Sequence, residues 1–130
     1  MDKEKFQLLL VEDEVLLAMR MKRNLELFGY QVHAPVATGQ AAIDSVAQQQ
    51  PDAIFMDIRM PGGMDGIQAA QAIREQYDIP IIFMTGYSNP EIVERARAVN
   101  PVAILEKPLL FNQIEAAIEA ALRKETQTGL

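Results

Sequence analysis

Several polar residues of this chain directly follow short apolar segments, namely LLLV, AIFM, IIFM and VAIL. In chain order these polar residues are Glu12, Asp13, Asp57, Thr85, Glu106 and Lys107. Carboxylates can hold a hard cation, and an amine with a hydroxyl can bind phosphoryl oxygens. If the four segments are parallel strands, their carboxyl ends meet at one edge of a sheet, where open α/β folds bind ligands. The sequence therefore predicts one polar site at that edge.

The acidic residues favour a magnesium site. Glu12, Asp13 and Asp57 would repel one another in a shared pocket, and their pKa values would rise unless a cation neutralised the charge. Mg²⁺ takes oxygen ligands and keeps several of its waters, so carboxylates suit it. The chain has no cysteine and a single histidine, His33, which argues against zinc. We therefore expect Mg²⁺ at these carboxylates.

Thr85 and Lys107 extend this chemistry to phosphoryl transfer. The loose transition state of that reaction needs positioning and charge compensation, which an amine and a hydroxyl beside a metal can supply. Asp57 could then act as a nucleophile through its carboxylate. Neither GxxxxGK[ST] nor GxGxxG occurs in the chain, so no nucleotide cradle is expected. The phosphoryl donor is therefore expected to be small or to be brought by a partner.

Strand-like and helix-like patterns alternate along the chain. The expected strands are residues 6–11, 30–34, 52–56, 79–84 and 102–105, and the expected helices are about 14–28, 38–50, 65–77, 90–99 and 110–124. Right-handed crossovers would cover both faces of a parallel sheet. We predict an α/β fold, a flavodoxin-like doubly wound five-stranded parallel sheet of order 2-1-3-4-5 with five helices. In that order the strands that precede Glu12 and Asp57 are neighbours.

Length and composition limit the possibilities further. A chain of 130 residues suggests one domain, with residues 125–130 as a frayed tail. No apolar run approaches the length of a membrane span, and Glu12 comes too early for a signal-peptide core. A cytoplasmic location without membrane attachment is therefore expected. The net charge of −6 argues against direct binding of nucleic acid.

Some conspicuous residues have simpler structural interpretations. Asp65 is expected to be the N-cap of a helix and to lie outside the site. His33 cannot build a metal cluster by itself, so a polar strand residue is the better interpretation. Core positions rather than a binding surface are expected for Met19, Met21, Met56 and Met84.

Taken together, the motifs resemble the receiver domain of two-component response regulators. They are VEDE at 11–14, MDIRMPGGMDG at 56–66, MTGYS at 84–88 and LEKP at 105–108. The resemblance extends from Leu8 to Leu122 and implies that residues 1–124 form a receiver domain. It further implies that Asp57 accepts a phosphoryl group from a phosphohistidine of a sensor histidine kinase or phosphotransfer protein.

The resemblance also implies roles for the other site residues. Glu12 and Asp13 would hold Mg²⁺ together with Asp57, and Arg59 would offer the metal its backbone carbonyl. Contacts to the phosphoryl oxygens would come from Thr85 and Lys107, and the Lys107-Pro108 bond would be cis. The protein would be a phosphorylation-controlled binding module that catalyses only its own phosphorylation and dephosphorylation. Its partner surface, which could also form a homodimer, would comprise residues 90–99, 102–105 and 110–124.

Two positions depart from the usual receiver pattern. The loop after Asp57 has one extra glycine, at Gly62-Gly63, and position 104 is Ile where many receivers have Tyr or Phe. The usual coupling between Thr85 and an aromatic residue is therefore in question, although Tyr87 is close enough in sequence to substitute in part.

Two other functions stay open beside the phosphoacceptor. An aspartyl-phosphate phosphatase would need a second acid two residues after Asp57, but position 59 is Arg. A constitutive scaffold would require loss of a site residue, whereas all of them are present. Bulky Arg59 and Tyr87 beside the site could hinder an attacking water, so a long-lived phosphoryl group is expected.

Overall fold

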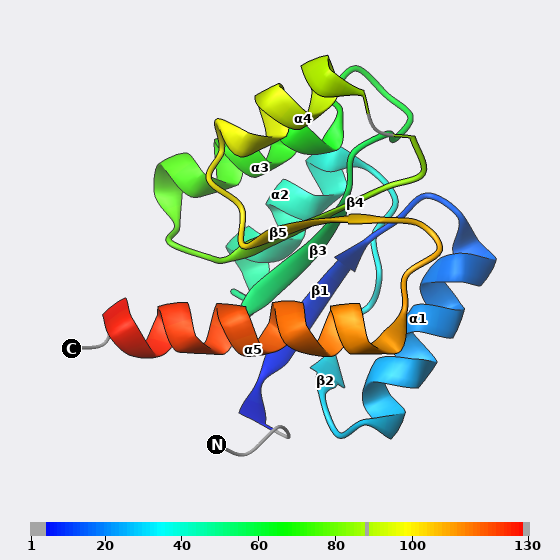
Figure 1. Ribbon diagram of the computed structural model, residues 1–130, viewed down its shortest axis with the longest axis vertical. Helices are drawn as coiled ribbons and strands as arrows, with labels where there is room; N and C mark the ends of the chain where they lie inside the picture. The colour runs from blue at the N-terminus through cyan, green and yellow to red at the C-terminus, as the bar shows by residue number, and fades with distance from the viewer. Residues whose placement is uncertain (1–4, 88, 129–130) are drawn as a thin grey trace.

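Five strands and five helices alternate along the chain in the computed structural model, which describes residues 5–87 and 89–128 (Figure 1). The strands are β1 Gln7–Val11, β2 Gln31–Val32, β3 Ala53–Asp57, β4 Ile81–Thr85 and β5 Ala103–Glu106. The helices are α1 Val15–Leu27, α2 Gly39–Gln48, α3 Gly66–Gln76, α4 Pro90–Arg97 and α5 Phe111–Thr128. All neighbouring strands pair in parallel, in the order β2-β1-β3-β4-β5. The predicted fold class and strand order are confirmed.

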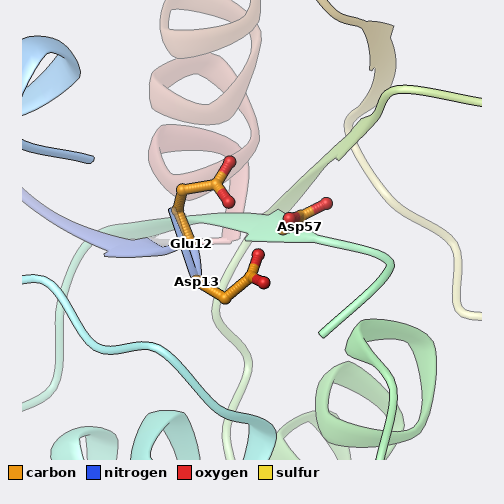
Figure 2. Close-up of side chains that lie close together, drawn as sticks. All are labelled: Glu12, Asp13 and Asp57. Atoms are coloured by element: carbon orange, nitrogen blue, oxygen red, sulfur yellow. The ribbon is translucent and has the colours of Figure 1, made fainter. Parts of the chain in front are cut away.

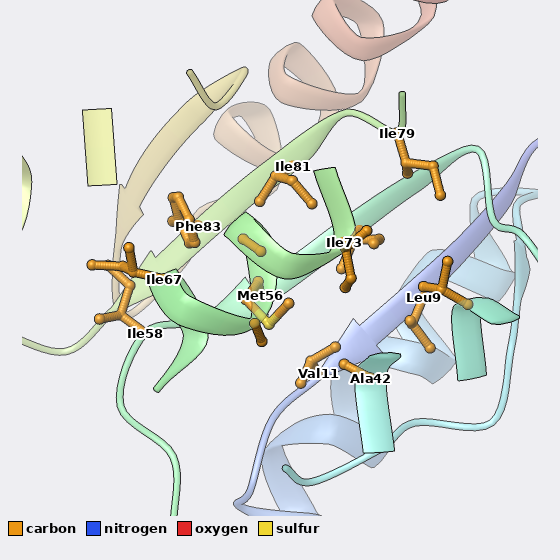
Figure 3. Close-up of a cluster of buried hydrophobic side chains, with 14 of the residues drawn as sticks. Leu9, Val11, Ala42, Met56, Ile58, Ile67, Ile73, Ile79, Ile81 and Phe83 are labelled. Carbon is orange, nitrogen blue, oxygen red and sulfur yellow. The ribbon is translucent and has the colours of Figure 1, made fainter. Parts of the chain in front are cut away.

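Two hydrophobic layers hold the sheet between its helices. Helices α2, α3 and α4 lie on one face, and α1 and α5 lie on the other (Figure 1). Every residue of β3 and β4 is buried, as expected of strands covered on both faces. Successive residues alternate between the layers, so that Leu9 and Val11 join the α2–α4 layer while Leu8 and Leu10 join the α1–α5 layer. Figure 3 shows the first of these layers.

Polar N-cap residues begin three of the helices, and the predicted cap Asp65 is one of them. The Thr38 hydroxyl accepts a hydrogen bond from the Ala41 N–H at 3.0 Å, which caps α2. Asp65 caps α3 in a capping box with Gln68. Asn89 caps α4, and Ser88, the residue before it, lies outside the described residues.

Three details differ from the prediction. The strand expected at 30–34 contains only Gln31–Val32, and Pro35 just beyond it has no N–H to donate to a ladder. The last helix continues through Thr128, past its expected end at about residue 124, while 129–130 lie outside the described residues and the frayed tail stays a prediction. Across the part of the chain that is described, no helix is both long and apolar enough to cross a membrane.

Met19 is the third difference. Its side chain is 61% exposed, whereas Met21, Met56 and Met84 are buried as expected. In α1 the buried residues are Ala18, Met21 and Leu25, whose spacing of three and four defines the inward face. Met19 lies one residue, or about 100°, away from Ala18, so it points outward.

Candidate functional site

The predicted site residues gather at the carboxyl edge of the sheet. Asp57 and Thr85 are the last residues of β3 and β4, while Glu12 and Lys107 directly follow β1 and β5. The register pairs Val11 with Met56, Asp57 with Met84 and Thr85 with Glu106, so these strand ends are level. Parallel pairing therefore brings together residues that are far apart in the sequence.

Three carboxylates face a common space at this edge (Figure 2). One oxygen from each of Glu12, Asp13 and Asp57 lies within 4.8 Å of the others. Glu12 is 2% exposed and Asp57 is 4% exposed, whereas Asp13 is open to solvent. An all-oxygen set with one open side fits a hard cation such as Mg²⁺, which keeps part of its water shell.

Lys107 supplies the positive charge that reaches the buried carboxylates. Its Nζ donates to Glu12 Oε1 at 2.6 Å and to Asp57 Oδ2 at 3.2 Å. The Lys107-Pro108 peptide bond is cis, as the resemblance implied. One ammonium therefore bonds two carboxylates while Asp13 adds a third acid to the group, and the cluster keeps an excess of negative charge.

This environment separates the pKa values of the two buried acids. Burial, together with the neighbouring Glu12, raises the pKa of Asp57 to about 7. Burial would also raise the pKa of Glu12, but hydrogen bonds from Lys107 and from the Glu14 N–H outweigh burial and lower it. The pKa of Lys107 rises although burial opposes this, because both carboxylates favour its charged form. In the metal-free site Asp57 is thus the acid that most readily holds a proton.

Thr85 is buried at the site, but its hydroxyl bonds elsewhere. Its Oγ1 donates to the Tyr87 carbonyl at 2.7 Å and accepts from the Tyr87 N–H at 3.2 Å. The Arg59 guanidinium lies over the Tyr87 ring, 5.2 Å from its centroid, which is a cation–π contact. Arg59 and Tyr87 therefore flank the site as expected, and the long phosphoryl lifetime stays a prediction that a half-life of only seconds would contradict.

Gly66 was not predicted to serve the site, yet it packs against the end of β3 at Asp57. A Cβ at Gly66 would overlap the Asp57 carbonyl oxygen, and its N–H donates to the Ile58 carbonyl at 2.8 Å. This bond closes the base of the loop that carries Gly62 and Gly63. The glycine in the MDG motif was the signal that could have revealed this close approach.

Asp65 lies outside the carboxylate cluster, as predicted. Its Oδ1 accepts from the Gln68 N–H at 2.8 Å, and its Oδ2 accepts from Arg95 Nη2 at 2.9 Å. Arg95 lies in α4, so this ion pair joins two helices. No local pattern in the sequence could have revealed it, because 30 residues separate the partners.

Comparisons with known proteins agree with this geometry. The family model of the response regulator receiver domain matches residues 8–119. The transcriptional regulatory protein PdtaR of Mycobacterium tuberculosis is 35% identical over 118 residues, which are 91% of this chain and 57% of that protein. YvrH of Bacillus subtilis is 34% identical over 125 residues, or 96% of this chain and 52% of that protein. The chain thus spans about half the length of these relatives.

Solved structures show the same architecture. The signal receiver domain of a modulated diguanylate cyclase from Desulfovibrio desulfuricans has a TM-score of 0.88 at 32% identity, covering 94% of this chain and 97% of that one. The N-terminal domain of a response regulator/sensory box/GGDEF protein from Carboxydothermus hydrogenoformans has a TM-score of 0.85 at 33% identity, covering 95% and 99%. With its carboxylates, lysine and threonine at the same sheet edge, the chain belongs to the response regulator receiver domain family.

Proposed function

We propose that this domain is the phosphoacceptor of a two-component system, in which Asp57 takes a phosphoryl group from a phosphohistidine of a sensor kinase or phosphotransfer protein. The observation that carries the proposal is the buried Asp57 carboxylate, which lies among acids and within 3.2 Å of the Lys107 amine. A buried carboxylate that has a raised pKa and is bonded to one cation has the properties of a reactive group.

Glu12, Asp13 and Asp57 would hold Mg²⁺ through their carboxylates, and Arg59 would add its backbone carbonyl. The bound ion would neutralise charge on the phosphoryl oxygens. A cation beside Asp57 also favours its ionised form, which the nucleophile needs. Lys107 contributes in the same direction, since its amine already reaches Asp57.

In the transfer step an Asp57 oxygen bonds to phosphorus as the P–N bond to the donor imidazole breaks. The imidazole leaves with the electron pair of that bond and regains a proton from solvent if required. The Lys107 amine then pairs with a phosphoryl oxygen instead of with Asp57 alone. Thr85 joins it once its hydroxyl turns from the Tyr87 carbonyl to another phosphoryl oxygen.

The surface beside the site suits a donor carried on another protein. Val15, Leu16 and Met19 in the first turns of α1 are exposed, Leu16 by 82%. An apolar cavity of about 670 Å³ between α1 and α5 reaches Gly86 and Lys107. Exposed apolar groups near a reactive site typically mark a protein contact. A phosphohistidine-bearing partner could therefore dock here.

The output of the domain would be a change in protein binding. A surface that includes α4, β5 and α5 would contact the downstream partner or a second copy of the domain. Direct binding of nucleic acid is not part of the proposal, and neither is turnover of small phosphate esters, because Arg59 stands where an aspartyl-phosphate phosphatase needs an acid. The proposed location is the cytoplasm, where sensor kinases present their phosphohistidine.

Intact mass after incubation with Mg²⁺ and acetyl phosphate tests the phosphoacceptor role. The wild type should gain one phosphoryl group, and Asp57→Asn should gain none. Asp52→Asn is a matched control, because Asp52 lies just before the amino end of β3, far from Asp57, and accepts a hydrogen bond from the Gln7 N–H. It should be phosphorylated like the wild type.

Two further results would bear on the proposal. Removal of Mg²⁺ with a chelator should abolish the mass gain, whereas folding, followed by circular dichroism, should persist. A folded wild type that gains no phosphoryl group, even with a phosphohistidine protein as donor, would overturn the proposal in favour of a constitutive scaffold.

A further inference from the structure

Helix α4 is loosely attached to the rest of the domain. Among its residues, all of which are described, only Ala96 is buried. Ile92 packs only partly against the α2–α4 core layer. On the outer side of α4, Arg95 forms an ion pair with Asp65, with 2.9 Å between Nη2 and Oδ2. A polar contact therefore supplements a small apolar anchor.

Asp65 is itself held next to the carboxyl end of the phosphoacceptor strand. The residue after it, Gly66, donates its N–H to the carbonyl of Ile58, the residue after Asp57. The capping box with Gln68 holds the Asp65 side chain in place at the start of α3. The connection from Asp57 to Arg95 thus bypasses the loop that contains the two adjacent glycines.

The connection before α4 has to change when a phosphoryl group is bound. In the described arrangement the Thr85 hydroxyl donates to the Tyr87 carbonyl and accepts from the Tyr87 N–H. A hydroxyl has one proton to donate, so Thr85 can donate to a phosphoryl oxygen only by releasing that carbonyl. Tyr87 lies three residues before Pro90, the first residue of α4. A filled site therefore acts on the segment that leads into this helix.

We infer that the Asp65–Arg95 ion pair is a latch, which holds α4 in the resting arrangement and opposes the change that phosphorylation of Asp57 drives. The inference rests on the proposed phosphoacceptor function and adds a regulatory contact to it. A ligand shifts a two-state equilibrium only by its differential affinity for the two states. A contact that exists only in the resting state therefore lowers the affinity for every ligand that selects the other state.

Ile104 makes such an outer contact more important. Its side chain is partly buried against the α2–α4 core layer and carries no polar group that could bond to Thr85 or Tyr87. Position 104 therefore supplies no polar contact that could restrain the segment before α4. The latch lies on the solvent side, where salt can screen it.

Binding of beryllofluoride, a phosphoryl analogue, in the presence of Mg²⁺ tests the latch by calorimetric titration of the intact chain. Asp65→Asn keeps a good N-cap but loses the charge, and Arg95→Gln removes the partner charge. Each variant should bind beryllofluoride about two- to fivefold more tightly than the wild type. This change in affinity corresponds to the free energy that an exposed ion pair contributes. The double variant should bind no more tightly than either single variant, because they remove the same contact.

Arg97→Gln is the matched control, since Arg97 is an exposed arginine of the same helix. It should bind beryllofluoride like the wild type, and a higher salt concentration should reduce the difference between the wild type and the latch variants. If Asp65→Asn and Arg95→Gln bind no more tightly than Arg97→Gln, the latch is wrong. If the folded wild type binds no beryllofluoride, the phosphoacceptor function fails and the latch fails with it.

Discussion

The two ends of the parallel strands both carry polar clusters, but only one of them is internally balanced. At the amino end the Gln7 N–H donates to Asp52 Oδ2 at 2.7 Å. The Gln7 amide oxygen accepts from His33 Nε2 at 2.7 Å and from Gln49 Nε2 at 3.2 Å. Amides, a ring N–H and one carboxylate thus satisfy one another.

At the carboxyl end the groups are charged, and the carboxylates outnumber the amine that bonds them. Lys107 is bonded to both Glu12 and Asp57, and Asp13 adds a third carboxylate. Burial of these charged groups costs more free energy than burial of the polar groups at the amino end, because charged groups lose more solvation energy. A satisfied cluster indicates a structural role, whereas an excess of buried charge of one sign indicates a site for a ligand of the other sign.

Removal of the Lys107 amine should have the largest effect. Lys107→Met leaves Glu12 and Asp57 buried without a cation, and we expect it to lower the free energy of unfolding by about 3 kcal/mol. Urea unfolding at pH 7 without Mg²⁺ measures this change. Lys22→Met is the control, because Lys22 pairs with Glu26 on the surface at 3.7 Å and should contribute about 0.5 kcal/mol or less. Equal losses in the two variants would show that the carboxyl-end cluster is no more sensitive to the loss of its cation than a surface ion pair.

The pH dependence of metal-free stability should follow Asp57. Its pKa is about 7 in the folded state, against 3.8 as the reference value. The folded state therefore binds more protons than the unfolded state between these values, so this stabilisation is full below pH 3.8 and is lost as the pH rises through 7. From pH 5 to 8, wild-type stability should fall by about 2 to 3 kcal/mol relative to Asp57→Asn.

Urea unfolding at several pH values measures this difference. Glu12 has a lowered pKa, so its stabilisation is present above pH 4.5 and is lost only as the pH falls below that value. Glu12 therefore contributes little to the change in stability between pH 5 and 8. Parallel pH profiles of the wild type and Asp57→Asn would show that the raised pKa has no energetic consequence.

Mg²⁺ should act on the carboxyl end alone. An ion that binds only the folded state at ten times its dissociation constant should add about 1.4 kcal/mol to the free energy of unfolding. Thermal unfolding followed by calorimetry should show this gain in the wild type and a smaller one in Asp13→Asn. Asp44→Asn, in an exposed part of α2, should behave like the wild type. An equal gain in Asp13→Asn would exclude Asp13 as a ligand.

The smallest effect is expected at the amino end. Gln7→Leu removes the oxygen that His33 and Gln49 share, and we expect it to lower the free energy of unfolding by about 1 kcal/mol. Phosphorylation by acetyl phosphate, followed by intact mass, should stay at the wild-type level. A loss of phosphorylation in Gln7→Leu would mean that this cluster also serves the reaction.

Local patterns made most of the fold and of the carboxyl-end site predictable. Apolar runs, helix caps such as Thr38 and Asp65, and the residues that follow each run are all short-range features of the sequence. The strand order then placed Glu12 and Asp57 together, because parallel neighbours end at the same edge. These predictions needed no knowledge of individual side-chain positions.

Contacts between distant surface residues were not predictable in this way. His33 and Gln7 are 26 residues apart and Arg95 and Asp65 are 30 apart, and each residue type is common on surfaces. The prediction for Met19 failed for a related reason. Apolar residues occupy several sides of the first turns of α1, so periodicity alone did not identify the outward face.

The glycine loop beside the site has a practical consequence for labelling this protein. A Cβ at Gly63 would meet no atom within 4 Å, and the bond from the Gly66 N–H to the Ile58 carbonyl closes the loop at its base. Gly62 has φ near 98° and should be left unchanged, whereas Gly63 can accept a side chain. Since the chain has no cysteine, Gly63→Cys would create a single thiol for a fluorescent dye. The fluorescence of a dye at this thiol, beside the carboxyl-end site, would then test for the proposed phosphorylation of Asp57.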